Sequence, residues 1–329
     1  MSFLCFQSID VKENNLLLSS MGYNAAMVDR QQIYRPLIFG EVLFDIFPDG
    51  RQVLGGAPFN VAWHLRGLGL DPLLVSRVGS DQRGEQILQR MAAWGLDVSG
   101  VQRDARRPTG EVRVRIERNE PHFEVLEDRA FDHIELGPIV ELLADAQPDL
   151  IYHGSLAARS AVSRATLHAL IRELPDVPLF LDVNLRAPWW ESELLGQMLG
   201  RARWVKLNLD ELQRIAPGPG EPEALCRELM KSRAIELVVL TLGAHGALLV
   251  PNDCEVFSAE PPGEVELVDT VGAGDAFSAA MIAAILRRKP LSEALQSALC
   301  LAARVCAMRG ATSENRSIYN GLCAAVEAS

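Results

Sequence analysis

Apolar runs typical of buried strands alternate with helical stretches along most of the chain. The run from Leu73 to Val78 is apolar, and residues 81–94 follow it with a helical period that ends at Gly95. The alternation predicts further strands at residues 37–47, 150–153, 179–183, 204–207 and 237–242, a helix at 161–174, and mostly helical structure from 273 to 328. Apolar strands separated by helices favour an α/β fold whose mostly parallel sheet is covered on both faces.

Two stretches depart from this alternation and predict hairpins. Val112, Val114 and Ile116 alternate with charged residues, and a second strand-like stretch, 121–127, follows a polar connection at Asn119. The sequence Pro-Asp-Gly at residues 48–50 predicts another hairpin turn. We therefore expect a small β lid made of pieces at about residues 44–54 and 107–127.

The first 32 residues show no sustained period. Short apolar clusters there are mixed with polar residues, and the regular pattern begins near Pro36. We expect residues 1–32 to form an N-terminal extension and residues 33–329 to form the α/β domain.

Composition restricts the classes of function. The chain has 329 residues, 48% of them hydrophobic and 23% charged, with a formal net charge of −11. This balance is typical of a globular protein, and its negative charge disfavours nucleic-acid or anionic-membrane partners. The chain has no apolar run of the ~18 residues that a membrane span needs and no signal peptide pattern. Its six cysteines form no C-x-x-C pair, so we expect a cytoplasmic protein without a disulfide framework or a structural metal.

The segment Asp269 to Phe277 carries the strongest chemical signal. Its Gly-Ala-Gly turn, Gly272 to Gly274, runs into an apolar helix, so its backbone N–H groups can bind an anion at the positive end of the helix. Asp275 follows in the first turn and could accept a proton from an attacking hydroxyl. Alternatively, an acidic residue at this place only complements the helix dipole.

Motifs of other enzyme classes are missing from the sequence. There is no Gly-x-x-x-x-Gly-Lys-Ser/Thr loop, no three-glycine dinucleotide motif, no H-E-x-x-H and no G-x-S-x-G. Nucleotide hydrolysis on a P-loop, hydride transfer and metalloprotease or serine-hydrolase chemistry are therefore disfavoured.

Four segments together resemble the ribokinase-type (PfkB) carbohydrate kinases. They are Gly55 to Ala62, which is similar to an N-terminal Gly-Gly-x-x-x-Asn signature, Asn208 to Glu211, Thr241 to Gly246, and Asp269 to Phe277. Each pattern is short, but their order and spacing cover about residues 36–325. The resemblance implies a three-layer ribokinase-like sandwich with a small β lid, and ATP-dependent transfer of the γ-phosphate to a sugar primary hydroxyl.

The resemblance also implies roles for single residues. Asp275 would be the catalytic base, and Gly272, Ala273 and Gly274 would form the anion hole. The implied sugar-binding residues are Asp45, Gly55, Gly56, Asn60 and Arg186. The implied nucleotide-binding residues are Asn208, Glu211, Thr241 and Gly243. Taken alone, Asp45 could be a residue of a strand-end turn and Glu211 a solvated helix start.

Two cations are implied as well. Asn208 and Glu211 would hold Mg²⁺ beside ATP, through water, and Asp269 would be a ligand of K⁺. The remaining motifs have simpler interpretations: the histidines lack partners at metal-ligand spacing, the Trp189-Trp190 pair predicts packing, and the Arg106-Arg107 pair predicts a solvated edge.

Several features bear on the substrate. The segment Asp182 to Trp190 resembles one shared by bacterial fructokinases and 2-keto-3-deoxygluconate kinases, whereas Gly40 to Asp45 and Pro108 to Val112 resemble the fructokinases more closely. Leu43 replaces an Asn that ribokinases carry. Arg186 suits a carboxylate or phosphate. We expect a fructokinase, with a 2-keto-3-deoxygluconate kinase or a catalytically inactive sugar-sensing protein as alternatives.

The apolar face of the lid also predicts a homodimer.

Overall fold

One nine-stranded sheet runs through the part of the chain that the computed structural model describes, residues 33–117, 120–144, 147–231, 233–263 and 267–322. Its strand order is β13-β12-β11-β10-β9-β8-β1-β4-β5, and all neighbours from β11 to β5 pair in parallel. The strands are β1 (Leu37–Phe39), β4 (Leu73–Gly79), β5 (Val101–Asp104), β8 (Ile151–His153), β9 (Leu179–Asp182), β10 (Trp204–Asn208), β11 (Leu237–Thr241), β12 (Ala247–Pro251) and β13 (Phe257–Ala259). Only β12 and β13 add to the edge as antiparallel strands.

The order of the strands creates a switch point between β1 and β8. From β1 the chain moves outward to β4 and β5, and it returns on the other side of β1 at β8. The connections therefore diverge at the carboxyl ends of these two neighbours. In open α/β sheets this is the place where ligands bind.

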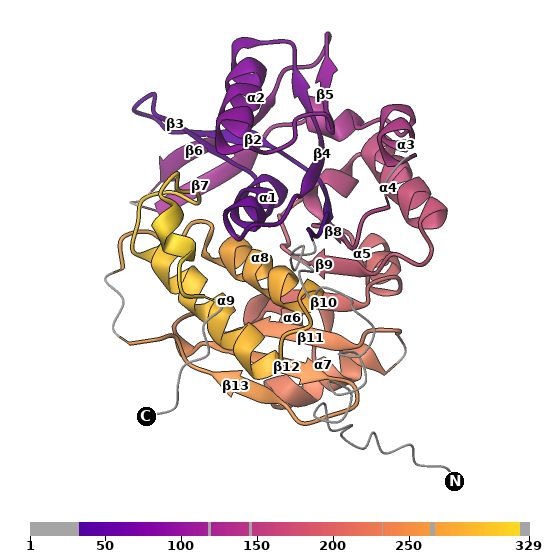
Figure 1. Ribbon diagram of the computed structural model, residues 1–329, viewed down its shortest axis with the longest axis vertical. Coiled ribbons are helices and arrows are strands. Elements are labelled where there is room, and N and C mark those ends of the chain that lie inside the picture. The colour runs from indigo at the N-terminus through magenta and orange to yellow at the C-terminus, as the bar shows by residue number, and fades with distance from the viewer. Residues whose placement is uncertain (1–32, 118–119, 145–146, 232, 264–266, 323–329) are drawn as a thin grey trace, which may run out of the picture. The chain divides into compact units, whose positions relative to one another are not determined.

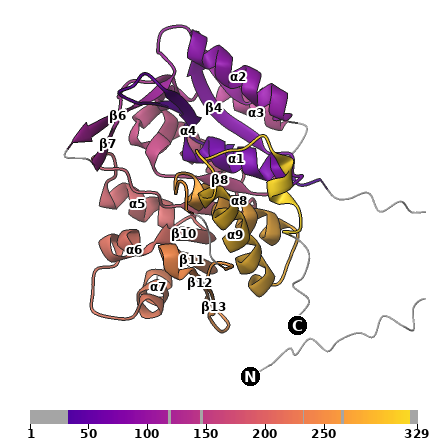
Figure 2. The same cartoon turned by 90° about the vertical axis from the view of Figure 1, so that its left-hand side faces the viewer.

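Helices cover the two faces of the sheet as two separate groups (Figures 1 and 2). Alternation along the strands sorts the core: Ile38 contributes to the first layer, whereas its neighbours Leu37 and Phe39 contribute to the second. The first layer holds α1 (Ala57–Gly67), α2 (Gln82–Trp94), α8 (Ala273–Leu286) and α9 (Leu291–Cys306). The second holds α3 (Gly137–Leu143), α4 (Ala161–Glu173), α5 (Ser192–Leu199), α6 (Leu209–Ile215) and α7 (Pro222–Met230). The described part of the chain therefore forms the three layers that the sequence predicted.

Helix α1 is an inner helix that packs against α8. Every residue from Ala57 to Leu65 is buried, so the helix has no solvent face in this stretch. His64 bonds the hydroxyl of Tyr319 and the carbonyl oxygen of Ala311 at 2.9 Å each. Burial lowers the pKa of His64 to about 4, so the ring is neutral and links α1 to the segment after α9.

A second, four-stranded sheet has the order β3-β2-β6-β7 and forms the predicted lid (Figure 1). Its strands are β2 (Leu43–Ile46), β3 (Gln52–Gly55), β6 (Gly110–Glu117) and β7 (Glu120–Val125). The two predicted hairpins are confirmed, and the parallel pairing of β2 with β6 joins them. The prediction of a single strand at residues 37–47 is wrong. The chain leaves the main sheet after Phe39, turns at Gly40 and enters the lid at Leu43.

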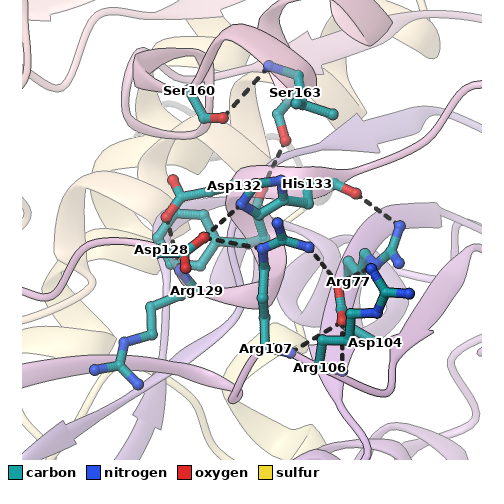
Figure 3. Close-up of polar contacts among 12 residues, drawn as sticks. Arg77, Asp104, Arg106, Arg107, Asp128, Arg129, Asp132, His133, Ser160 and Ser163 are labelled. Carbon is teal, nitrogen blue, oxygen red and sulfur yellow. Dashed lines mark hydrogen bonds and ion pairs between the residues drawn. The ribbon is translucent and has the colours of Figure 1, made fainter.

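Charged residues tie the base of the lid to the core (Figure 3). Asp128, after β7, accepts bonds from Arg107 Nε at 2.9 Å and bonds His133 Nε2 at 2.8 Å. Buried Asp104 accepts the backbone N–H groups of Arg106 at 2.8 Å and Arg107 at 3.0 Å. The side chain of Arg106 is exposed, as predicted, and that of Arg107 is partly exposed and pairs with the exposed Asp128. Its guanidinium joins the segments that enter and leave the lid.

The predicted fold class is thus confirmed, and most element bounds agree within two residues. The helical end is α8 and α9, followed by the 3₁₀ helix η4 (Arg316–Tyr319). The proposed extension at 1–32, Asn119 and the last seven residues, 323–329, lie outside the described residues. The boundary at residue 33 stays a prediction. Among the helices in the described ranges, none is long and apolar enough to cross a membrane.

Candidate active site

The Gly-Ala-Gly turn forms the start of α8. Gly272 caps the helix with φ +79°, and a Cβ at this position would lie 2.3 Å from Cβ of Ala311. Only glycine fits both the left-handed backbone and the close approach. The N–H of Ala276 donates to Gly272 O at 2.9 Å, and the N–H of Ala273 donates to Thr270 O at 3.3 Å. The amide of Ala273 is therefore partly used within the turn, whereas the turn as a whole keeps the geometry of a helix N-terminus that can bind an anion.

Asp275 lies in the first turn of α8, and Asn60 on α1 holds it. The Nδ2 group of Asn60 donates to Asp275 Oδ2 at 2.7 Å, which joins two positions 215 residues apart in the sequence. Burial raises the pKa of Asp275 from its usual 3.8 to about 6, and the charge of Asp182 adds to this effect. The bond from Asn60 and the charges of Lys206 and Arg186 act in the opposite direction. The carboxyl is oriented and has a pKa close to neutral, as a general base requires.

The predicted sugar residues lie where β2 and β3 leave the main body. Asp45 is on β2, and a Cβ on Gly55 would lie 3.6 Å from Asp45 Oδ2. Gly56 has φ +109°, and a Cβ there would lie 2.7 Å from Glu41 O, so this position also requires glycine. Burial raises the pKa of Asp45 to about 6. Arg186 is exposed, and its charge lowers the pKa of both Asp45 and Asp275, so these residues share one region.

Asn208 and Glu211 form a capping box at the start of α6. Asn208 Oδ1 accepts the N–H of Glu211 at 2.9 Å, and Glu211 Oε2 accepts the N–H of Asn208 at 2.9 Å. The other oxygen, Oε1, accepts the N–H of Leu185 at 2.8 Å. Glu211 is buried, so the interpretation as a solvated helix start is wrong. Because both carboxylate oxygens already accept backbone N–H groups, the donor set suits Mg²⁺ held through water better than direct coordination.

The predicted nucleotide-binding residues Thr241 and Gly243 lie at the end of β11 and just after it, and the predicted potassium ligand Asp269 lies before α8. Thr241 ends β11 opposite Asn208 on β10, and Gly243 opens the 3₁₀ helix η3 (Gly243–His245). Asp269 Oδ1 accepts the N–H of Val271 at 3.0 Å, and its Oδ2 accepts the N–H of Gly310 at 3.1 Å. Asp269 therefore joins the loop before α8 to the loop after α9. The carboxylate oxygens of Asp269 suit a hard cation such as K⁺, whose binding stays a prediction.

A buried polar cluster beneath α8 was missed by sequence reasoning. Lys206 Nζ lies 3.0 Å from both carboxylate oxygens of Asp182, and Ser278 Oγ donates to Asp182 Oδ2 at 2.7 Å. A Cβ on Gly274 would lie 3.2 Å from Lys206 Nζ, which places this cation against the turn. Lys206 is the one charged residue in the strand Trp204–Asn208. A single charge in an otherwise apolar, buried strand indicates a buried polar cluster, so the sequence could have predicted this one.

Glu41 was missed as well. It lies between β1 and β2 and is buried, and burial raises its pKa to about 7. The charges of Arg186 and Arg159 lower this pKa, and the charge of Asp275 raises it. In the sequence, Glu41 is the single acidic residue within the apolar run from Leu37 to Leu43, and this pattern could have indicated a buried acid.

The combination of this turn, base and lid agrees with a comparison to known families. The profile of the pfkB family carbohydrate kinases matches residues 23–317. The chain belongs to the PfkB family. Among its relatives, a putative sugar kinase of Pyrococcus horikoshii, PH1459, is 31% identical over 245 residues, which cover 72% of this chain and 74% of the relative.

Two fructokinases are also similar to this PfkB kinase. The fructokinase of Klebsiella pneumoniae is 27% identical over 259 residues, covering 75% of this chain and 83% of the relative. The crystal structure of the fructokinase from Vibrio cholerae, bound to fructose, ADP and calcium ion, matches with a TM-score of 0.75 at 25% identity. That match covers 87% of this chain and 98% of the other. Family membership makes the chain a carbohydrate phosphotransferase, and the residues above are its candidate active site.

Proposed function

We propose that this PfkB kinase transfers the γ-phosphate of ATP to a primary hydroxyl of fructose, with Asp275 as the base. One observation carries the proposal: Asp275 is fixed by Asn60 at 2.7 Å in the first turn of α8, directly after the Gly-Ala-Gly turn. This arrangement places a proton acceptor next to an anion-binding helix start. Phosphoryl transfer needs both groups in this proximity.

Each site residue has its own role in the proposed transfer. Ionised Asp275 accepts the proton of the sugar hydroxyl as the oxygen attacks the γ-phosphorus, and Asn60 keeps the carboxylate in position. Backbone N–H groups of Gly272 to Gly274 stabilise the charge on the transferring phosphoryl group. Asp45, Gly55, Gly56 and Arg186 orient the sugar.

The nucleotide side provides the charge balance for ATP. We assign Asn208, Glu211, Thr241 and Gly243 to the nucleotide, with Asn208 and Glu211 holding Mg²⁺ through water. When bound, Mg²⁺ neutralises phosphate charge. Asp269 is the candidate ligand for K⁺, which would fix the loops on both sides of the anion hole.

Two fructokinases among the relatives support fructose as the proposed sugar. The Klebsiella and Vibrio fructokinases match most of the chain, and the second was solved with fructose and ADP. A panel that measures ATP consumption with fructose, 2-keto-3-deoxygluconate and ribose tests the assignment directly. We expect fructose to give the highest kcat/KM, and a higher value with the keto acid would overturn the fructose assignment. Binding of sugar without any turnover would instead indicate the inactive sensor.

We also propose a homodimer that forms through the lid. Part of the lid's apolar face is covered within the chain, because Val112 and Val125 pack with Leu43 and Phe131. Among the described side chains of the lid, the large apolar one left exposed for a second copy is Phe123 on β7, at 55%. Light scattering should give twice the chain mass, and Phe123→Ser should shift the protein toward the monomer. A wild-type monomer at assay concentration would contradict the proposal.

A further inference from the structure

Arg186 lies on an exposed turn after β9. Arg186 and the two residues after it are exposed, and the N–H of Trp189 closes the turn by donating to Arg186 O at 2.7 Å. The chain before the turn is fixed to the body: Ser155 Oγ donates to Asn184 O at 3.1 Å, and the N–H of Leu185 donates to a carboxylate oxygen at the start of α6 at 2.8 Å. An exposed side chain on such a turn keeps one position at a low entropic cost if the far end of the turn is held as well.

The ring of Trp189 holds that far end. It is half-buried, packs against the second layer of the core, and has its centroid 4.5 Å from Cζ of Arg159. Arg159 is the last residue of the 3₁₀ helix η2 (Leu156–Arg159), and its side chain is 5% exposed. The ring of Phe131 lies over the same guanidinium at 5.0 Å. Because a desolvated guanidinium attracts the face of an aromatic ring, Arg159 fastens the turn to the body.

Asp132 and the segment that leaves the lid hold Arg159 in turn. The Nε and Nη2 atoms of Arg159 donate to the two oxygens of Asp132 at 2.8 and 2.9 Å, and Nη2 also donates to Leu126 O at 2.6 Å. Asp132 belongs to the 3₁₀ helix η1 (Ala130–His133), at the base of the lid (Figure 3), and Leu126 directly follows β7. The two parallel bonds neutralise the guanidinium and fix its plane. Arg159 therefore joins the exit of the lid to the turn that carries Arg186.

The charges of both arginines reach the proposed sugar-binding region. Burial raises the pKa of Glu41 to about 7, and the charges of Arg186 and Arg159 lower it. The charge of Arg186 also lowers the pKa of Asp45 and Asp275. Within the described residues, Nη1 of Arg159 is buried without a hydrogen-bond partner, so it leaves part of the charge uncompensated. A displacement of the turn would therefore change the charge around the sugar.

We propose that Arg159 is a positioning residue for the sugar: through the ring of Trp189 it fixes the turn that places the guanidinium of Arg186 against the substrate. This inference rests on the proposed function, in which Arg186 orients the sugar. Arg159 and Trp189 act through Arg186, so their loss should weaken the binding of the sugar and leave the binding of the nucleotide unchanged.

Trp189→Leu tests the contact without disturbing the buried ion pair of Arg159 and Asp132. The substitution removes the ring and keeps an apolar side chain. Calorimetric titration of the full chain should show that the dissociation constant of fructose rises roughly 5- to 30-fold, as expected for the loss of one largely desolvated cation–π contact. The dissociation constant of ADP should not change. Trp189→Phe keeps a ring and should restore most of the affinity. Trp190→Leu, at the next and also half-buried position, is the matched control and should bind fructose as the wild type does.

A double-mutant cycle separates this role from a merely structural one. In Arg186→Gln the guanidinium that the turn positions is gone, so adding Trp189→Leu should change the dissociation constant of fructose little. Arg159→Lys keeps a charge beside Asp132 but loses the flat, forked group. It should weaken fructose binding as Trp189→Leu does, and the two changes together should add nothing further. An unchanged dissociation constant in Trp189→Leu, or an equal effect with and without Arg186→Gln, would show that Trp189 only packs and would overturn the inference.

Failure of the proposed function would look different. If the sugar panel favours another sugar, the same cycle is measured with that sugar. If Arg186→Gln alone leaves sugar binding unchanged, the assignment of Arg186 to the sugar is wrong, and the inference is overturned with it. If Arg186→Gln weakens sugar binding and Trp189→Leu weakens it by the same factor in both backgrounds, the inference alone is overturned and the assignment of Arg186 stands.

Discussion

The proposed sugar end of the candidate site, with Glu41, Asp45 and Asp275, and its proposed phosphate end, with Asp182 and Glu211, use carboxylates in opposite ways. At the sugar end, burial raises the pKa values of Asp275 and Asp45 to about 6 and that of Glu41 to about 7. At the phosphate end, Asp182 bonds Lys206 and Ser278, and both oxygens of Glu211 accept backbone N–H groups. Carboxylates with unused bonding capacity can exchange protons with a ligand, whereas saturated ones hold the backbone in position.

Asp275→Asn should give the largest effect. Asn keeps the size of the side chain and can still accept the bond from Asn60, but it cannot take the hydroxyl proton. We expect kcat to fall by roughly 10²–10⁴-fold, with much smaller changes in sugar and ATP binding. Steady-state kinetics beside calorimetric titration measures both quantities. Asp253→Asn, at an exposed position after β12, is the control. Near-normal kcat in Asp275→Asn would mean that the proton leaves by another route.

Lys206→Met tests whether the phosphate end is held together by its ion pair. The substitution leaves Asp182 buried without its cation, which typically lowers the free energy of unfolding by about 3–5 kcal/mol. Urea denaturation measures this loss. Lys231→Met is a suitable control because Lys231 is exposed and pairs with Glu228 on the surface, where the expected change is below about 1 kcal/mol. If Lys206→Met lowers the free energy of unfolding no more than the control does, the ion pair with Asp182 does not hold the phosphate end together.

The pH dependence of activity and stability tests the raised pKa of Asp275. Because burial raises the pKa of Asp275 to about 6, kcat/KM should fall about tenfold for each pH unit below that value, as the base becomes protonated. The free energy of unfolding should change in the opposite direction and increase as pH falls. The folded state holds this proton more tightly than the unfolded state, so the contribution of Asp275 to the free energy of unfolding decreases as pH rises from about 4 to 6.

Asp275→Asn provides the comparison for that pH dependence. It removes a buried titrating group, so the variant should gain stability relative to wild type above pH 6 and lose this advantage near pH 4. Urea denaturation at both pH values measures the difference. A constant difference would show that Asp275 does not titrate near 6.

Glu211→Gln should have the smallest effect. The amide keeps one acceptor oxygen, so one of the backbone N–H groups of Asn208 and Leu185 loses its partner. We expect a loss of about 1 kcal/mol in the free energy of unfolding and a higher Mg²⁺ requirement. Thermal unfolding and an activity titration with Mg²⁺ report on the two roles separately. Glu228→Gln, an exposed pair member, should change neither; an unchanged Mg²⁺ requirement in Glu211→Gln would restrict Glu211 to its capping role.

Local patterns were enough to place most of the elements. The helix predicted at residues 81–94 from its period is found at Gln82–Trp94 and ends at Gly95 as the sequence indicated, whereas Asp81 caps its start. The strand prediction at 37–47 failed because residues on both sides of Gly40 are apolar and β-prone, while only tertiary packing assigns them to different sheets. Hydrophobicity measures burial, and a buried residue can belong to either sheet.

The sequence by itself determined the motifs that carry the chemistry. The Gly-Ala-Gly turn, Asp275 and Asn60 are local features, because a turn needs its glycines and a helix start needs its cap wherever the chain places them. The tertiary structure alone decided that Asn60 meets Asp275, that Asp132 neutralises Arg159, and that Glu41 is left without such a partner. These contacts join segments far apart in the chain. Burial and hydrogen bonding at each carboxyl depend on those neighbours, so the raised pKa values of Asp275, Asp45 and Glu41 and the saturated carboxylates of Asp182 and Glu211 arise only in the folded protein.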